Sequence, residues 1–594
     1  MTDWFEENTL RSHLLLWLGL ILVWSQSIHN GYIALDTQWL VVQNPILQST
    51  SIDVLPQIWF DFSLGTRLTL GAEYLPIRDM TVWIDWILFK DSWGGHHVQS
   101  FMWYGIACSL LLSCNRILFG KTWMVWLGTA IFMVHPTHVE SVIWLASRKD
   151  VVSLAFSFLA LWLFLRKTSF YWIGLVVLLA YWAKNTAIVV GPLLVLLSLC
   201  HNHEKEAPWS TVQWWLSWLP IAIPLIVGLY ITLKVGDSVA MFAEPRGNNS
   251  VETLNIAAQT WTKYWEMLIW PTQLSLFYAE PTVTDWTSSD VWIGVSLSTL
   301  LTIVGSVQWF YDRKWTLALY TIPLGLLPVS QITPIQNLMA DRYLLLPSLG
   351  LCWCIILLLK AIHSHSRLGI WIVTIWGLNL SLFTSERIHL FQDDIRLWRD
   401  VTEKEPLEIR GWTTLASLYR KQQRIAEANT TIEKATEVHP DSPKIILAKG
   451  MTALSSGDKQ SAIVHFEQAW QSDNTLREAG NNWVLLLQKE DGMKAVDVAQ
   501  QLTSIHPLYA KGWDVLGSSC LQTKDWICAE NSFARALEIA PYQVSTHANL
   551  GTLAYLQENW TQAQQWWLRT LELNPTHNYA TRGLKAIQEQ SHTP

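Results

Sequence analysis

Charged residues are scarce in this sequence, and neither sign is in large excess. Lys, Arg, Asp and Glu together make up 15% of the 594 residues, against about 25% in ordinary globular proteins. The formal net charge is only −7. Proteins that bind nucleic acid need a basic surface, so the composition argues against nucleic acid as a partner.

Cysteine is also sparse, and its spacing does not fit a metal site. The chain has seven cysteines, and none are spaced like the ligands of a zinc site. Five lie in apolar segments and are interpreted as small core residues: Cys108, Cys114, Cys200, Cys352 and Cys354. Cys520 and Cys528 lie in a polar region, where an oxidising compartment would permit a disulfide; two separate buried thiols are the equal alternative.

Long apolar runs are abundant, but only in the first two thirds of the chain. A membrane-spanning helix needs about 20 mostly apolar residues. Eleven segments are candidates: 12–28, 98–118, 121–135, 150–166, 169–184, 186–201, 211–234, 290–311, 314–330, 342–362 and 367–385. No small-residue cleavage site follows the first segment, so it is interpreted as an anchor. We expect an all-α protein with a membrane domain at 1–385, a linker at 386–405 and a repeat domain at 406–594.

The distribution of Lys and Arg indicates the orientation. If the N-terminus is cytoplasmic, every short inner loop is basic, through Arg116, Lys121, Arg166, Lys167, Lys205, Arg313, Lys314, Lys360 and Arg367. With eleven spans, the repeat domain then lies in the periplasm or a lumen. Some cations fall on the outer side against this rule: Arg67, Arg78, Arg148, Lys149, Lys184 and Arg342. We interpret them as groups that bind an anion there.

The polar third of the chain repeats with a period close to 34 residues, which is typical of tetratricopeptide repeats. Prolines end four of the five expected units, at positions 440, 507, 541 and 575. The first and fourth units follow the pattern most closely, and the third is degenerate. The pattern residues are Trp412, Leu415, Ala416, Tyr419, Ala428, Ile432 and Ala435 in the first unit, and Trp513, Leu516, Gly517, Ala529, Phe533 and Ala536 in the fourth. Such repeats stack into an α-solenoid that binds peptides or extended protein.

Ionisable residues gather in one stretch between two apolar segments, "MVHPTHVESVIWLASRKD" at 133–150. Such groups close to the hydrocarbon layer are costly and usually functional. The alternative is an interfacial loop whose charges pair with one another. His135, His138 and Glu140 have part of a metal-ligand pattern, but no fourth ligand is evident, and we predict no metal. We expect the stretch to form one wall of an outward-facing polar site.

Four stretches, the first of them within 133–150, carry a resemblance to a known family. They are "HPTHVESVIWLASRKD" at 135–150, "LMADRYLLLPSLG" at 338–350, "YWEMLIWPTQLSLFY" at 264–278 and "YLPIRDMTVWIDW" at 74–86. Together with the repeats they resemble the transmembrane-and-tetratricopeptide (TMTC-like) family, whose members are multispan glycosyltransferases of the GT-C fold. The resemblance covers nearly the whole chain, and its short loops and compact repeats favour a bacterial member.

The resemblance implies an inverting O-glycosyltransferase of the hexosyl or mannosyl type. A polyprenyl-phosphate sugar donor in the bilayer would supply the sugar to Ser or Thr hydroxyls of an acceptor protein presented by the repeats. The family's catalytic acid stands eight residues before an Asn, which here makes Asp36, before Asn44, the general base. Thr37 stands where the family has a second acid. We predict no firm cofactor, with a divalent cation as the minor alternative.

The other site residues would serve the donor. Arg148, Lys149 and Arg342 are predicted to bind its phosphate, because Arg can fork onto two phosphate oxygens and Lys supplies a point charge. For Arg342 the alternative is a salt bridge with Asp341. The remaining residues would orient the donor or shape the first outer loop: His135, His138, Glu140, Arg78 and Asp79.

Two other functions remain open at this point. A ligase that uses a lipid-pyrophosphate oligosaccharide should have longer outer loops with an Arg-rich catalytic segment, which this sequence lacks. A membrane-anchored repeat scaffold without activity would need neither eleven spans nor an outer-face Asp and Arg.

Overall fold

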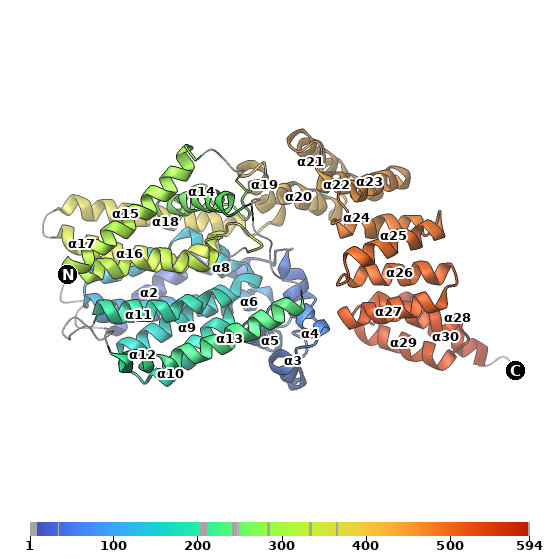
Figure 1. Cartoon of the computed structure of the whole chain (residues 1–594), viewed down its shortest axis with the longest axis horizontal. Helices are drawn as coiled ribbons and strands as arrows, with labels where there is room; N and C mark the ends of the chain where they lie inside the picture. The colour runs from blue at the N-terminus through green and yellow to red at the C-terminus, as the bar shows by residue number, and fades with distance from the viewer. Residues whose placement is uncertain are drawn as a thin grey trace. The chain divides into compact units, whose positions relative to one another are not determined.

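Every regular element of the described residues is helical in the computed structural model (Figure 1). The structure describes residues 9–33, 35–201, 211–239, 246, 249–281, 286–331, 335–363 and 366–591. The predicted inner-loop cation Lys205 and the last three residues lie outside these ranges. The chain divides into two compact units: residues 1–59 with 73–408, and residues 60–72 with 409–594.

A helix lies in each of the eleven segments predicted to span the membrane. These are α2 (Thr9–Trp24), α6 (Trp93–Phe119), α7 (Trp123–Met133), α9 (Arg148–Leu165), α10 (Phe170–Ala183), α11 (Val190–His201), α13 (Leu219–Ser238), α15 (Ser289–Tyr311), α16 (Arg313–Leu326), α17 (Pro347–His363) and α18 (Arg367–Leu390). Four of them, α6, α13, α15 and α18, are long and apolar enough to cross a membrane. The chain is therefore a membrane protein, and the number of eleven spans stays a prediction.

Short helices and turns connect these segments. They are η1 (Ser25–His29), η2 (Gln38–Val42), η3 (Ile52–Val54), α3 (Leu55–Phe60), α5 (Pro76–Phe89), η4 (Pro136–His138), α8 (Val139–Ile143), η5 (Leu145–Ser147), η6 (Asn185–Val189), α12 (Val212–Ser217), α14 (Ser250–Ile269), η8 (Leu327–Val329) and η9 (Asp341–Leu344). Helix α5 begins with Pro76, whose fixed φ suits a first helical position. Helix α9 packs between α6 and α10, and α16 packs along α17.

The segment expected as a linker, 386–405, is instead part of the membrane unit. It holds the end of α18 and helix α19 (Asp394–Lys404), capped by the Asp393 carboxylate, which accepts from the Arg396 N–H. Leu397 and Trp398 are fully buried, and Trp398 stacks on Phe277 at 5.5 Å between ring centroids. The polar composition concealed this helix because only one of its faces is apolar.

The second unit contains five helix pairs and a final helix, coloured brown to red in Figure 1. The pairs are α20 (Ile409–Lys421) with α21 (Ile425–Val438), α22 (Pro443–Ser455) with α23 (Lys459–Ser472), α24 (Arg477–Leu487) with α25 (Gly492–Ile505), α26 (Ala510–Gln522) with α27 (Trp526–Ile539) and α28 (Val544–Leu556) with α29 (Trp560–Leu573). Helix α30 (Asn578–Ser591) follows them, and α4 (Leu64–Thr69) belongs to the same unit. These helix pairs lie where the sequence predicts five repeats.

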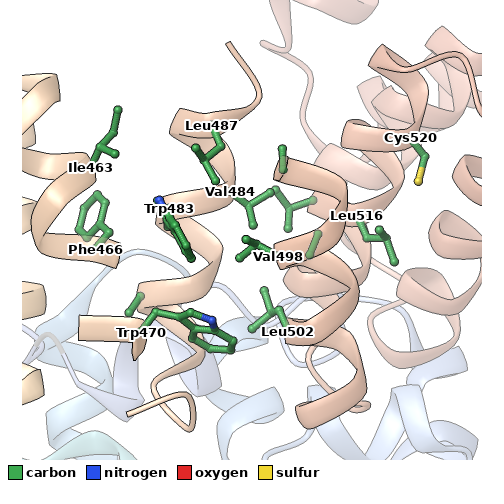
Figure 2. Close-up of a cluster of buried hydrophobic side chains, with 14 of the residues drawn as sticks. Ile463, Phe466, Trp470, Trp483, Val484, Leu487, Val498, Leu502, Leu516 and Cys520 are labelled. Carbon is green, nitrogen blue, oxygen red and sulfur yellow. The ribbon is translucent and has the colours of Figure 1, made fainter. Parts of the chain in front are cut away.

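Repeated local signals build this unit. The second helices of repeats two to five each begin with a side-chain cap, from Asp458, Asp491, Asp525 and Asn559. A Cβ at Gly517 would overlap the Phe533 ring, which explains the small residue at this repeat position. Figure 2 shows the resulting core, in which Phe466, Trp470, Trp483 and Leu502 from successive helices pack together. Cys520 and Cys528 form a disulfide between α26 and α27.

Candidate functional site

Charged side chains from five separate segments meet at one end of the membrane unit. They come from the first loop, α8, the start of α9, the junction of α10 with η6, and η9. A cavity with about 450 Å³ of empty space, part of it open to solvent, lies among them. Its lining residues are Asp150, Ser153, Leu154, Ser157, Lys184, Thr186, Ala187, Gly325, Val329, Arg342, Tyr343, Leu345 and Leu346.

Arg342 lies at this cavity, and Glu140 fixes its position. One Glu140 carboxylate oxygen accepts the backbone N–H of Arg342 at 3.2 Å, and the other is paired with the guanidinium. The guanidinium carbon also lies 5.2 Å from the ring centroids of both Trp144 and Tyr343. The ion pair uses one terminal nitrogen, Nη1, so other N–H donors of Arg342 are not used by Glu140.

Asp341 is not the partner of Arg342, which corrects the alternative drawn from their adjacency. It pairs with the buried Arg387 of α18 and accepts the hydroxyl hydrogen of Tyr278. Neighbouring residues in a short helical turn point in different directions, so Asp341 and Arg342 turn to different partners. Burial raises the pKa of Asp341 to about 6, although the Arg387 charge opposes this.

Lys149 and Arg78 share one carboxylate. Glu73 lies 2.7 Å from Lys149 Nζ and 3.1 Å from Arg78 Nη1, and Asp79 lies 2.7 Å from Arg78 Nη2. Burial alone would raise the pKa of Glu73, but the charges of Lys149, Arg78 and Lys184 together bring it below its ordinary value. Glu73 thus links Lys149 to Arg78, and Asp79 holds Arg78 from its other side.

Asp36 lies in the same cluster. Its carboxylate is exposed and accepts from Trp39 Nε1 at 3.3 Å, and its charge acts on Arg342. Thr37 is buried beside it. Asn44 is buried too, and its side-chain oxygen accepts the N–H groups of Ile46 and Leu47 at 3.1 Å each. Of the two residues that define this spacing, Asp36 is therefore an accessible acid and Asn44 stabilises a turn.

His135 and His138 lie beside the cluster, but their ring nitrogens are already engaged. His135 contacts Thr137 Oγ1 at 2.7 Å and the Leu268 carbonyl at 3.1 Å. His138 contacts Tyr104 at 2.7 Å and Ser348 at 2.9 Å, and burial lowers its pKa, so the ring is neutral. The geometry therefore argues against the predicted contact of these rings with a donor. Within the described ranges, no three His, Cys, Asp or Glu residues are placed to hold a metal ion.

Arg148 is likewise engaged in the interior. Its guanidinium pairs with Asp85 and donates to Ser100 at 3.0 Å, Gln99 at 2.9 Å and the His96 carbonyl at 2.8 Å. Only 1% of the residue is exposed. Such a saturated cation has little left for a phosphate, so the geometry gives Arg148 a structural role. Of the three predicted phosphate-binding cations, Arg342 lines the cavity and Lys149 lies near it, paired with Glu73.

One ion pair at the cavity was not predicted from the sequence, which placed Lys184 only among the outer cations interpreted as binding an anion. Lys184 Nζ is paired with Asp150, and both residues are largely buried. The charges of Arg342, Lys149, Glu73 and Glu140 all act on Lys184. The only signal in the sequence was a lysine on the outer side against the charge rule.

Comparisons with known proteins cover both halves of the chain. The model described as "Tetratricopeptide repeat" matches residues 409–442. The chain is 22% identical over 374 residues to "Protein O-mannosyl-transferase F38B6.6" of Caenorhabditis elegans, which is 60% of this chain and 52% of that protein. It is 27% identical over 143 residues to human "Protein O-mannosyl-transferase TMTC3", which is 24% of this chain and 16% of that protein. The chain thus spans about half the length of the first relative, and less of the second.

Parts of solved structures are also similar to part of the chain. YrrB, a TPR protein with an unusual peptide-binding site, is 17% identical with a TM-score of 0.26, over 32% of this chain and 97% of that one. The Pseudomonas aeruginosa protein pilF is 18% identical with a TM-score of 0.28, over 31% of this chain and 86% of that one.

Proposed function

We propose that this chain is a member of the TMTC-like family and a membrane O-glycosyltransferase, which its similarity to two protein O-mannosyl-transferases and its tetratricopeptide match support. It transfers a hexosyl group, mannosyl in the family's animal members, from a polyprenyl-phosphate donor to Ser or Thr hydroxyls. The repeats present the acceptor protein. In this proposal the membrane half is a GT-C fold of about eleven spans, with the N-terminus cytoplasmic and the repeats outside, in the periplasm of a bacterial inner membrane.

The observation that supports the proposal is an accessible acid whose charge acts on a fixed cation. Asp36 is exposed, and its charge acts on Arg342, which Glu140 holds at the cavity. A lipid-phosphate sugar donor needs both groups: a base for the acceptor hydroxyl and a cation for the departing phosphate.

The reaction follows from these positions. Asp36 removes the proton of the acceptor hydroxyl as the oxygen forms a bond to the anomeric carbon. The bond from that carbon to the phosphate oxygen breaks, and the polyprenyl phosphate leaves with the bonding electrons. Attack from the face opposite the phosphate inverts the anomeric centre. Arg342 and Lys149 stabilise the negative charge that develops on the phosphate. The proposal needs no metal and no other cofactor.

Two experiments test the proposal. The purified full-length chain should transfer labelled mannose from a polyprenyl-phosphate donor to an acceptor protein from the same cells. Mass spectrometry of outer-compartment proteins, with and without the gene, should show a hexose mass lost from Ser or Thr peptides. Unchanged glycan masses together with no transfer in vitro would reject the proposal.

A further inference from the structure

The ion pair of Asp150 and Lys184 has no role in the proposed sugar transfer. Both residues line the cavity that Arg342 also lines. Their side chains are 2% and 12% exposed, so the pair is almost removed from water. Burying an ion pair is costly, and it often contributes little to stability, so its position at a cavity points to another use.

Asp150 keeps an unused acceptor at the cavity. Its Oδ1 is paired with Lys184, whereas its Oδ2 has no hydrogen-bond partner among the residues that the structure describes. A buried carboxylate oxygen without a donor is costly, since water has been removed from it. A hydroxyl group entering the cavity would supply the missing donor.

The wall beyond Asp150 continues as a row of hydroxyls. Ser153 and Ser157 follow at helical spacing on the same face of α9 and line the same cavity. Each donates its hydrogen to a backbone carbonyl, Ser153 to Ala180 at 2.9 Å and Ser157 to Ser153 at 2.7 Å. Their oxygens therefore keep lone pairs that can accept. From Asp150 to Ser157 this row extends about 10 Å along the helix.

This arrangement suits a polyhydroxyl ring better than the other parts of the donor. A phosphate would be repelled by the Asp150 carboxylate, and an isoprenoid chain would leave the ion pair without any polar partner. A sugar offers neighbouring hydroxyls that both donate and accept. One can donate to Asp150 Oδ2 while its neighbour accepts from the Lys184 ammonium.

We propose that Asp150 and Lys184, with Ser153 and Ser157 beyond them, form the subsite that binds the sugar ring of the donor and selects it by its hydroxyls. The inference rests on the proposed function and deepens it. Arg342 holds the phosphate at the same cavity, and the ion pair holds adjacent hydroxyls of the ring. The pair is then a specificity determinant and takes no part in bond making.

The test separates sugar from phosphate by using two lipids. The full-length chain in nanodiscs is titrated with undecaprenyl phosphate and with undecaprenyl-phosphate mannose. Asp150→Asn keeps the size of the side chain and removes its charge. It should weaken binding of the mannosyl lipid roughly tenfold or more, because hydrogen bonds to charged groups are strong. The affinity for bare undecaprenyl phosphate should change by about twofold at most, because this lipid has no sugar hydroxyl that could donate to Asp150.

Controls keep each outcome interpretable. Asp290→Asn, an exposed carboxylate at the start of α15, should change neither affinity. The double variant Asp150→Asn with Lys184→Gln removes both charges together, so it tests the subsite without leaving a buried orphan charge. It should also distinguish less well between mannosyl and glucosyl lipids than the wild type does.

Three results would overturn the inference. If the affinities for both lipids fell equally, the ion pair would be a structural or phosphate-binding element and not a sugar subsite. Unchanged affinities and unchanged sugar selectivity in both variants, with an active wild type, would reject the subsite and leave the proposed function standing. A wild type that binds neither lipid and transfers no sugar would reject the proposed function, and the subsite with it.

Discussion

The Glu140 carboxylate contacts Arg342 twice, at its backbone N–H and at its guanidinium, although 202 residues separate them in the chain. The first contact fixes where η9 begins relative to α8, and the second fixes the direction of the side chain. A cation held in this way needs no rearrangement when charge develops on a leaving phosphate, which is the condition for strong electrostatic catalysis.

Arg342→Lys should keep part of the transfer activity, and Arg342→Ala should lower it at least about a hundredfold, because a preorganised cation is lost. Lys keeps the charge but not the planar fork that contacts Glu140 and the phosphate together. The measurement is transfer rate together with donor affinity, and the donor affinity should fall while acceptor binding stays unchanged. The matched control is Arg166→Ala, which removes an exposed arginine directly after the last residue of α9.

A purely structural salt bridge predicts a different result for Arg342. In that case Arg342→Ala would leave Glu140 as a buried uncompensated charge, and adding Glu140→Ala would remove it. Recovery of activity in the double variant would contradict a role for Arg342 in phosphate binding.

Asp36→Asn should lower transfer by at least about a hundredfold, since the base is lost while the size of the side chain is kept. Asp36 is exposed, so the substitution should leave the melting temperature unchanged. Donor affinity should also be nearly unchanged, which separates Asp36 from Arg342. A well-folded Asp36→Asn protein with normal turnover would rule out the general-base role.

Glu73 should make stability depend on acid pH. Its folded-state pKa lies below its ordinary value of 4.5, because Lys149, Arg78 and Lys184 outweigh its burial. A carboxyl with a lowered folded-state pKa contributes stability above pH 4.5, and this contribution is lost as the pH falls through the folded-state pKa. Glu73→Gln should therefore melt at a lower temperature than the wild type near pH 7, and the difference should shrink below pH 4.5.

The control for Glu73 is Glu266→Gln, which removes an exposed carboxylate from α14. It should show almost no stability change at either pH, as is usual for exposed pairs. A Glu73→Gln difference that stays constant down to pH 3 would argue against the charge of Glu73 as its source.

The disulfide between Cys520 and Cys528 should stabilise the repeats. It closes a loop of sequence separation 8, so replacing both residues by Ala should lower the free energy of unfolding by about 2–3 kcal/mol. Thermal unfolding with and without dithiothreitol measures this, and the reductant should affect only the wild type. Titration of two free thiols in the unreduced, unfolded repeats would contradict the bond.

The repeats should face the same side of the membrane as Asp36. A cysteine introduced at Gln557, between α28 and α29, should react with an impermeant maleimide in spheroplasts, with Lys167→Cys as the inner-side control. Protection at position 557 and labelling at position 167 would reverse the predicted topology.

Local patterns in the sequence predicted the helices, whereas tertiary packing determines which charged residues form ion pairs. The 34-residue period located the repeats because each repeat meets only its neighbours. The cluster of charges at 133–150 located Glu140, but nothing local indicates that it meets Arg342 and that Asp341 turns to Arg387. These contacts join distant segments, so they depend on how α8, η9 and α18 pack.

The same limit explains the histidines and Arg148. From the sequence alone, the ring of His138 and the guanidinium of Arg148 look free to bind a ligand. In the folded protein, partners from other helices occupy them: Tyr104 contacts His138, and Asp85 pairs with Arg148. The ion pair of Lys184, which the sequence placed only among the outer cations, was missed for the converse reason. Its neighbour Asp150 is 34 positions away, and only the packing of α9 on α10 brings them together.

The two buried ion pairs around η9 also constrain how the gene can diverge. A sequence that lost Glu140 but kept Arg342, or lost Asp341 but kept Arg387, would carry an uncompensated buried charge. We therefore expect the two members of each pair to change together. A chimaera that joins the first 200 residues of one relative to the remainder of another should therefore fold only when both parents have matching residues at positions 140 and 342, whatever their overall identity.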